Sequence, residues 1–347
     1  MIKKAENIIV GISIGDLNGI GSEVILKTFE DSRMLELCTP VIFANVKCLS
    51  FVKKNLESTS MLQGIDRLNQ IVLGKINVLN VWQENVEINF GVNDENIGKY
   101  AIKSFVTATK ALKEGLIDVL VTAPINKYNI QSEDFKFPGH TDYLDLELDG
   151  NALMLMVQDN LRVGLLTDHI PLNEVALHLT EALIVQKIET IKQSLIQDFS
   201  INKPKIAVLG LNPHCGDGGV IGKEDDEILK PTIKKLFDKG TLVFGPFAAD
   251  GFFGSNQYDK YDAVVAAYHD QGLIPFKTLS FGNGVNYTAG LNKIRTSPDH
   301  GTAYDIAGKG IADYNSFKEA VYLAIDIYNS RNQYAEISQK PLKTKEK

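Results

Sequence analysis

The sequence predicts an α/β protein whose mainly parallel sheet carries helices on both faces. Strand-like apolar runs alternate with helix-like patterns along most of the 347 residues, which is typical of chains built from βαβ units. Polar and glycine-rich turns follow several of the apolar runs, as they do at the carboxyl ends of strands in open α/β sheets. The length allows two domains, but neither a linker nor an internal repeat marks a boundary in the sequence.

The first elements are expected to be a strand, a turn and a helix. Residues 8–14 (IIVGISI) form an apolar run that predicts a strand, and residues 15–21 form a glycine-rich turn. A helix is then expected to begin at Ser22. Residues 118–121 (DVLV) indicate a second, short buried strand that ends in the loop TAPINK.

Four later helices are predicted from their spacing and their ends. Residues 99–114 repeat apolar side chains at helical spacing, and Thr180 suits the N-cap of the next helix. Residues 224–227 are all acidic and therefore favour the positive end of a third helix. Ser316 with Glu319 predicts a capping box for the last long helix.

Composition and charge exclude several classes of protein. The net charge of −7 argues against a general nucleic-acid binder, and no apolar stretch in the sequence is as long as a transmembrane helix. The three cysteines, Cys38, Cys48 and Cys215, are odd in number and widely spread. They imply no disulfide framework, so we expect a cytoplasmic protein.

Three of the six histidines stand just past the end of an apolar run. They are His169 in RVGLLTDHIPL, His214 in KIAVLGLNPHCGDGG and His269 in DAVVAAYHDQG. Because functional residues of open α/β sheets gather at the carboxyl ends of parallel strands, three such imidazoles are expected to converge on one divalent metal and leave a position for substrate. A loop-capping role explains any one of them alone. The placement that all three share favours a metal-assisted enzyme.

Two motifs in the first half of the chain offer a place for an anion. The turn GDLNGIGSEV (residues 15–24) lacks the G-x-G-x-x-G spacing of the dinucleotide fingerprint. It still suits an anionic ligand or a close backbone approach at a helix N-terminus, and a simple tight turn is the alternative. In PGHTDYL, His140 and Thr141 place an imidazole beside a hydroxyl. That pair can hold phosphate or carboxylate, although a plain helix start has the same pattern.

Two motifs in the second half contain metal candidates. The loop NPHCGDGGVIG (residues 212–222) is rich in glycine, so its backbone N–H groups can approach a ligand. Its Cys215 is expected to be a small buried residue rather than a nucleophile. In YHDQGLIPFK, Asp270 is a candidate metal ligand, partner of a ligand, or base, and Lys277 is a candidate anion partner or proton carrier. Asp250, in GPFAAD, is either a further carboxylate at the metal or a solvated loop residue.

The stretch RTSPDHGTAYDIAGKGIAD (residues 295–313) is too rich in small and turn-forming residues for an ordinary helix. Its segment HGTAYDIAG resembles the adenine-binding loop of the isocitrate and isopropylmalate dehydrogenases. Together with GHTDYL, TDHIPL, GLNPHCGDGG and YHDQGL, in this order over nearly the whole chain, it resembles the 4-hydroxythreonine-4-phosphate dehydrogenase family of that superfamily. The first turn reads GDLNGIG where GEPAGIG is expected, and Cys215 and Asp217 replace an expected alanine and glutamate. These departures affect the fine shape of the pockets.

The resemblance implies an overall architecture and an assembly. The family's fold has two α/β/α domains of the isocitrate/isopropylmalate dehydrogenase type with the active-site cleft between them. A discontinuous terminal domain with the cofactor loop is expected over residues 1–125 and 278–347, and a central domain with metal ligands and dimer contacts over residues 126–277. The family is a homodimer that shares metal ligands between its subunits. The net charge and the lack of a long apolar stretch predict no nucleic-acid or membrane partner.

The resemblance also implies site residues. The ligands of one divalent ion (zinc, magnesium, manganese or cobalt) would be His169, His214 and His269. The substrate-binding residues would be His140, Thr141, Lys277, Asn286 and Arg295. The residues that contact NAD would be Asn212, Gly216, Gly218, His300, Gly301, Thr302, Ala303 and Asp305. The catalytic candidates are Lys277, Asp270 and Asp250. The sequence does not choose between Lys277 and Asp270 as the proton acceptor, and Asp250 is a further carboxylate at the metal.

The implied reaction is a NAD-dependent, metal-assisted oxidation of 4-phosphooxy-L-threonine to a 3-keto acid. That acid would lose carbon dioxide to give 3-amino-2-oxopropyl phosphate on the route to pyridoxal 5′-phosphate. A paralogue that oxidises threonate or erythronate 4-phosphate is the nearest alternative, because one polar change in the pocket separates the two substrates. A phosphate acyltransferase or a non-catalytic nucleotide-binding protein would not need the three histidines. NAD rather than NADP rests on the resemblance alone.

Overall fold

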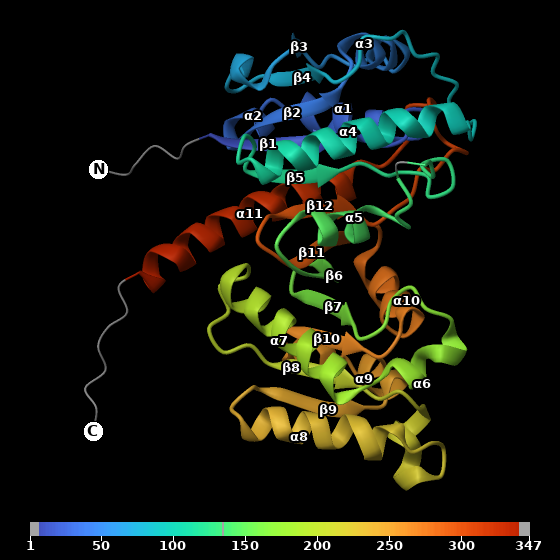
Figure 1. Cartoon of the computed structure of the whole chain (residues 1–347), viewed down its shortest axis with the longest axis vertical. Helices are drawn as coiled ribbons and strands as arrows, with labels where there is room; N and C mark the ends of the chain where they lie inside the picture. Colours follow the sequence, from blue (N-terminus) through green and yellow to red (C-terminus); the bar gives the residue numbers. More distant parts are fainter. Residues whose placement is uncertain (1–6, 134, 340–347) are drawn as a thin grey trace. The chain divides into compact units, whose positions relative to one another are not determined.

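The computed structural model describes residues 7–133 and 135–339, and it has the α/β fold that the sequence predicts (Figure 1). The chain forms two compact units. Unit 1 comprises Met1–Ala152, Val285–Tyr287 and Leu291–Ile325, and unit 2 comprises Leu153–Gly284, Thr288–Gly290 and Asp326–Lys347. Compactness alone does not test the expected domain boundaries, which stay a prediction.

Unit 1 contains a sheet in which the strands run in the order β3-β4-β2-β1-β5-β12-β11. These strands are β1 (Ile8–Ser13), β2 (Cys38–Ala44), β3 (Leu62–Ile65), β4 (Ile76–Asn80), β5 (Val119–Thr122), β11 (Val285–Leu291) and β12 (Arg295–Pro298). Neighbours pair in parallel from β3 to β12, and β11 pairs antiparallel to β12. The helices are α1 (Gly21–Glu30), α2 (Met34–Leu37), α3 (Val46–Asn55), α4 (Glu95–Lys113) and α5 (His140–Glu147), with a 3₁₀ turn at Leu68–Gln70.

Unit 2 contains strands in the order β6-β7-β10-β8-β9. They are β6 (Gly150–Gln158), β7 (Leu161–Leu165), β8 (Ile206–Leu209), β9 (Val243–Phe247) and β10 (Ala263–Ala266). All pair in parallel except β6, which runs antiparallel to β7. The α-helices are α6 (Val175–His178), α7 (Glu181–Gln197), α8 (Lys230–Asp238), α9 (Ala249–Gly254) and α10 (His269–Ser280). The shorter helical segments are Leu172–Glu174, Asp225–Leu229 and Gln257–Lys260, and Pro213–Gly219 is a turn with non-helical backbone angles.

Each unit has its own apolar core. In unit 1, Phe105 and Leu112 of α4 are fully buried against Phe43 and Leu120 of the sheet. In unit 2, the core gathers side chains of β7, β8 and β10 with Phe252 and Phe276. Because parallel strands are covered on both faces, they read as continuous apolar runs in the sequence.

Most of the predicted elements are confirmed. The first strand and the start of α1 lie where expected, and the Thr180 hydroxyl accepts a hydrogen bond of 3.2 Å from the Leu183 N–H as the N-cap of α7. Residues 224–227 do open a helical segment, although its first turn is a π-helix. Helix α4 begins at Glu95, earlier than predicted, because Asp94 caps it.

The predicted capping box at the last helix, Ser316 with Glu319, stays a prediction. Helix α11 (Asn315–Ser338) already begins one residue before Ser316. The Ser316 hydroxyl accepts a hydrogen bond of 3.0 Å from the backbone N–H of Asp299. Its oxygen therefore also holds the preceding loop. Among the described residues, no helix combines the length and the apolar character that crossing a membrane requires.

Candidate functional site

The three candidate metal ligands follow three neighbouring parallel strands of unit 2. His169 follows β7, His214 follows β8, and His269 is the first residue of α10 after β10. Strand β10 lies between β7 and β8 and pairs in parallel with both. All three imidazoles therefore start from the same edge of this sheet, as the sequence predicts.

His169 and His269 are neighbours. Their ring centroids are 6.0 Å apart, and both rings line a hollow of about 310 Å³ together with Asp168 and Asp270. Asp270 Oδ1 lies 2.7 Å from His269 Nδ1. When Nδ1–H donates to this carboxylate, Nε2 of His269 is left with its lone pair for a metal. The geometry gives Asp270 the position of a residue that orients His269.

His214 lies in a left-handed turn at the end of β8. His214, Cys215 and Asp217 have φ values of 54°, 55° and 45°, a conformation that costs a non-glycine residue about 1–2 kcal/mol. Gly216 shares the turn, and a Cβ there would lie 2.7 Å from the Gly222 carbonyl oxygen. Strain of this kind persists only where the surroundings hold it, and it is common at functional sites.

A buried carboxylate holds this turn. Asp225 is fully buried, and its side chain accepts hydrogen bonds from the backbone N–H groups of Leu211 at 2.9 Å and Asn212 at 3.0 Å. The side-chain amide of Asn212 also donates to Asp225 at 3.0 Å and to Glu224 at 2.9 Å. The side-chain amide of Asn212, which is predicted to contact the cofactor, is thus bonded within the loop. Gly218, another predicted cofactor residue, has open space around it.

The His214 turn borders a second hollow of about 330 Å³. Asp250, Tyr268 and Gln271 line it with His214, and Tyr268 also lines the hollow of the other two histidines. The Gln271 side chain donates to the Gly210 carbonyl at 2.6 Å and accepts from the Ala267 N–H at 2.7 Å. It therefore ties the carboxyl end of β8 to that of β10.

These residues fit a divalent metal in their chemistry, since neutral imidazole with nearby carboxylates is a common donor set for zinc, cobalt and manganese. Within the described part of one chain, however, no three histidine, cysteine or acidic side chains lie close enough to hold an ion together. His169 and His269 offer two ligands in one place.

A separate polar cluster in unit 1 joins three side chains distant in the sequence. Arg295 is 3% exposed, and its Nε and Nη2 donate to the Thr122 hydroxyl at 3.0 and 2.6 Å. Nη2 also lies 3.0 Å from Nδ1 of His140. Burial lowers the pKa of Arg295 to about 9, so the guanidinium remains charged at neutral pH.

The arginine determines the tautomer of His140. A guanidinium can only donate, so Nδ1 must accept and the imidazole proton must sit on Nε2. Burial, and then the charges of Arg295 and Lys127, hold the pKa of His140 well below 6.5, so the ring is neutral. Nε2 is buried and has no hydrogen-bond partner among the described residues. It is a donor available to an anionic ligand.

The other predicted substrate residues are only partly brought together. Thr141 is the second residue of α5, directly after His140. Asn286 lies on β11, which pairs with β12 at Asn286↔Ser297, and its Oδ1 is buried without a partner among the described residues. Lys277 is an exposed residue of α10 in unit 2.

The predicted cofactor loop packs on the first glycine turn. The N–H of Ile20 donates to the Thr302 carbonyl at 3.0 Å, and a Cβ on Gly19 would lie 2.8 Å from the same oxygen. Only glycine allows this approach, so the turn serves close backbone packing. Ala303 has a positive φ of 44°, and Nε2 of His300 is buried with no partner within the described chain. Gly301 and Asp305 are exposed in the same loop.

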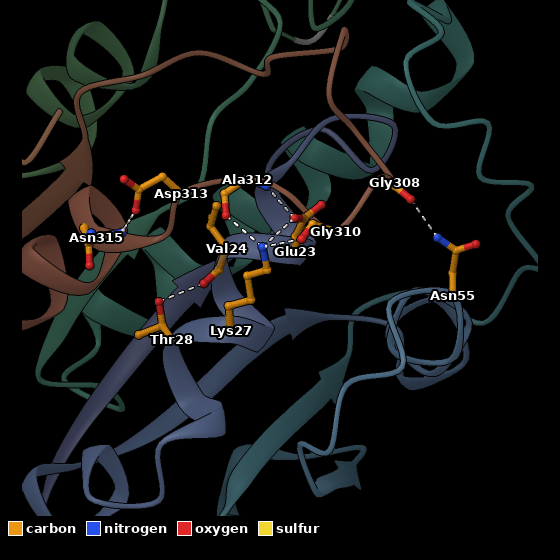
Figure 2. Close-up of polar contacts among 10 residues, drawn as sticks. All are labelled: Glu23, Val24, Lys27, Thr28, Asn55, Gly308, Gly310, Ala312, Asp313 and Asn315. Carbon is orange, nitrogen blue, oxygen red and sulfur yellow. Dashed lines mark hydrogen bonds and ion pairs between the residues drawn. The ribbon is translucent and has the colours of Figure 1, made fainter.

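The segment after this loop is clamped to α1 (Figure 2). Glu23 is 2% exposed and accepts from the Ala312 N–H at 2.8 Å. Lys27 lies 2.9 Å from Glu23 and donates to the carbonyls of Gly310 and Ala312 at 2.9 and 2.8 Å. These contacts fix the chain just beyond the candidate cofactor loop.

The sequence did not reveal several residues that position the site. They are Thr122, Gln271 and Asp225. Each lies inside or beside a recognisable motif, but its partner is set by the fold. Cys215 is half-buried and donates to the Pro246 carbonyl at 3.4 Å. Burial raises the pKa of its thiol, which agrees with the prediction that it is not a nucleophile.

Comparison with known proteins shows which family the chain matches. A family model described as "Pyridoxal phosphate biosynthetic protein PdxA" matches residues 36–324. A 4-hydroxythreonine-4-phosphate dehydrogenase from Bacteroides thetaiotaomicron is 47% identical over 336 residues, covering 96% of this chain and 92% of that protein. A putative D-threonate 4-phosphate dehydrogenase from Oceanobacillus iheyensis is 35% identical over 324 residues, covering 92% and 97%.

A solved structure gives the same match. The crystal structure of 4-hydroxythreonine-4-phosphate dehydrogenase from Klebsiella pneumoniae superposes with a TM-score of 0.80 at 32% identity. The match covers 94% of this chain and 99% of that one.

Proposed function

Because the chain belongs to the family of the pyridoxal phosphate biosynthetic protein PdxA, we propose that it is a NAD-dependent 4-hydroxythreonine-4-phosphate dehydrogenase. It would oxidise the C3 hydroxyl of 4-phosphooxy-L-threonine and pass hydride to the nicotinamide. The 3-keto acid would then lose carbon dioxide to give 3-amino-2-oxopropyl phosphate.

The observation that carries this proposal is the placement of His169, His214 and His269 at the ends of three neighbouring parallel strands. These imidazoles would hold one divalent ion, with ligands shared across a homodimer. A bound divalent ion stabilises charge on a reacting oxygen and lowers the pKa of a bound hydroxyl. An acyltransferase has no use for three such histidines.

We assign recognition of the phosphate to the cluster around His140. The Nε2–H of His140 and the hydroxyl of Thr141 would donate to phosphate oxygens, with Asn286 as a further polar contact. Arg295 is already bonded to Thr122 and His140. Its part would be to supply positive charge and to keep the His140 proton on Nε2.

The contact of Asp270 with His269 supports a positioning role for Asp270. Lys277 is then our candidate for the proton acceptor, and Asp250 is a carboxylate beside His214. We place NAD at the loop that includes His300, Gly301, Thr302, Ala303 and Asp305. The loop glycines Gly216 and Gly218 would offer backbone N–H groups. Three free thiols support a reducing, cytoplasmic setting.

The absorbance of NADH tests the proposed dehydrogenase activity directly. Purified protein with 4-phosphooxy-L-threonine, NAD and zinc or magnesium is expected to form NADH. A chelator should stop the reaction, and added metal should restore it. Absence of NADH under all these conditions would contradict the proposal.

The alternative substrate is D-threonate 4-phosphate, which the similarity to the Oceanobacillus iheyensis protein favours. It carries a hydroxyl where 4-phosphooxy-L-threonine carries an amino group, so its charge differs at one position. A higher kcat/KM for the threonate ester than for the amino acid ester would establish the paralogous activity instead.

A further inference from the structure

A hollow in unit 2 lies at the end of the sheet opposite to the three histidines. It has a volume of about 580 Å³, which is in the usual range for small-molecule sites. Its lining includes Asn160 and Arg162 at the start of β7, Lys205 before β8, and Asp262 before β10. Because β7 has five residues, about 13 Å separates its two ends. The hollow is thus remote from the candidate metal site.

The side chains around this hollow are mainly cationic. Four of them are basic, and they are Arg162, Lys203, Lys205 and Lys260. Two are acidic, Asp259 and Asp262. The carboxylate of Asp262 accepts a hydrogen bond of 2.7 Å from the backbone N–H of Lys205, so part of its negative charge is already engaged. The excess of positive charge attracts an anion.

Arg162 supplies buried donors. It is 9% exposed, and its guanidinium lies 4.4 Å from the centre of the Phe199 ring. Nη1 donates to the carbonyls of Asn160 and Asp262 at 3.2 and 3.3 Å. Nε is buried and has no partner within the described residues. A buried guanidinium with an unused donor is costly, and an oxyanion matches its geometry.

We propose that this hollow binds a small phosphate monoester. Its phosphate would be held by Arg162 and the lysines. Its organic group would contact the rings of Phe199 and Tyr261, which line the same hollow. This inference does not depend on the proposed dehydrogenase activity, because it concerns other residues and a different end of the strands.

Lysine labelling tests the proposal locally. Lys203, Lys205 and Lys260 are exposed, so an acylating reagent should modify them, and mass spectrometry measures each rate. Phenyl phosphate at constant ionic strength is expected to slow the acylation of all three lysines at least threefold. This protection should saturate as the phenyl phosphate concentration rises. The exposed Lys239 on the same unit is the matched control and should keep its rate. The readout is unaffected by phosphate that binds near His140.

Variants and a second probe complete the test. Arg162→Met should abolish protection, and its melting curve checks folding. Lys203→Gln with Lys205→Gln, both on the surface, should raise the half-protecting concentration for Lys260 at least fivefold. Inorganic phosphate should protect only at higher concentrations than phenyl phosphate, because it lacks the ring. Any of four results would overturn the proposal. Phenyl phosphate could slow the acylation of Lys239 as much as that of the other lysines, or sodium chloride could slow acylation as much as phenyl phosphate does. The two phosphate probes could protect at equal concentrations, or the three lysines could fail to react before any probe is added.

Discussion

The hydroxyl of Tyr304 donates a hydrogen bond of 2.7 Å to the carboxylate of Asp16, which stands 288 positions earlier in the chain. Asp16 is 1% exposed and also accepts from the Asn129 side chain at 2.7 Å. Burial and the neighbouring Asp16 carboxylate raise the pKa of Tyr304, so its hydroxyl keeps the proton that it donates. This bond anchors the candidate cofactor loop to the first glycine turn.

Tyr304→Phe is therefore expected to weaken both the fold and cofactor binding. The change leaves a buried carboxylate with one donor fewer, which costs about 1–3 kcal/mol of unfolding free energy. The KM for NAD should rise more than kcat falls, because the loop is loosened while the reacting groups stay. Urea denaturation and NAD titration measure these effects. Tyr128→Phe, at a side chain that is 70% exposed, is the control, and equal behaviour of the two variants would contradict the role.

The sequence predicted those parts of the site that depend on residues close together in the chain. The position of each histidine after a strand is a local pattern, and it was predicted correctly for His169, His214 and His269. The bond between Asp16 and Tyr304 is not local. A single sequence carries no signal that pairs residues so far apart, so only the fold reveals it.

The same reason explains the other residues that were missed. Thr122 ends a buried strand and looks like an ordinary strand residue, yet it accepts both hydrogen bonds from Arg295. Ser316 was predicted from a local motif, and the fold adds a tertiary partner at Asp299 that the motif does not reveal. Local chemistry predicts candidate groups, and tertiary contacts assign their roles.

His140 is expected to contribute one hydrogen-bond donor to substrate binding. His140→Phe removes Nε2–H, and loss of a charge-assisted bond of about 1.5–3 kcal/mol corresponds to a KM for the phosphorylated substrate roughly 10–100-fold higher. His140→Gln keeps an acceptor toward Arg295 and a donor toward the ligand, so its KM should lie between those of the parent protein and of His140→Phe. Initial rates of NADH formation give these constants. A Gln variant as impaired as the Phe variant would exclude the donor role.

The low pKa of His140 predicts a loss of stability in acid. In the unfolded chain this group titrates near 6.5, whereas burial holds it neutral in the folded chain at that pH. Below about pH 6.5 the unfolded state binds one more proton, so stability falls as pH falls, by up to about 1.4 kcal/mol per pH unit. The unfolding free energy of the parent protein minus that of His140→Phe should therefore fall as the pH is lowered from about 7.5 to about 5.5. Urea denaturation at each pH measures it, and a constant difference would disprove the assignment.

Asp270→Asn should weaken metal binding without preventing it. The carboxylate lies 2.7 Å from Nδ1 of His269, and losing such a partner typically lowers metal affinity about 10–100-fold. Competition with a zinc-sensitive chelator reports affinity without any need for turnover. Asp238→Asn, at an exposed site on the surface of α8, should leave affinity unchanged. Unaltered affinity in the Asp270 variant would remove its positioning role.

Asp225→Asn should release the strained turn that carries His214. The N–H of Leu211 bonds Oδ1 and the N–H of Asn212 bonds Oδ2, so an amide sets its NH2 donor against one of these two N–H donors. The unpaired donor costs about 1–3 kcal/mol. The left-handed backbone at His214 then loses its support, and zinc affinity should fall with it because the imidazole is no longer held in place. The unfolding free energy from denaturation and the zinc affinity from chelator competition should therefore both fall in this variant. A loss of stability with full zinc affinity would show that Asp225 supports the fold alone and that the turn presents His214 without its help.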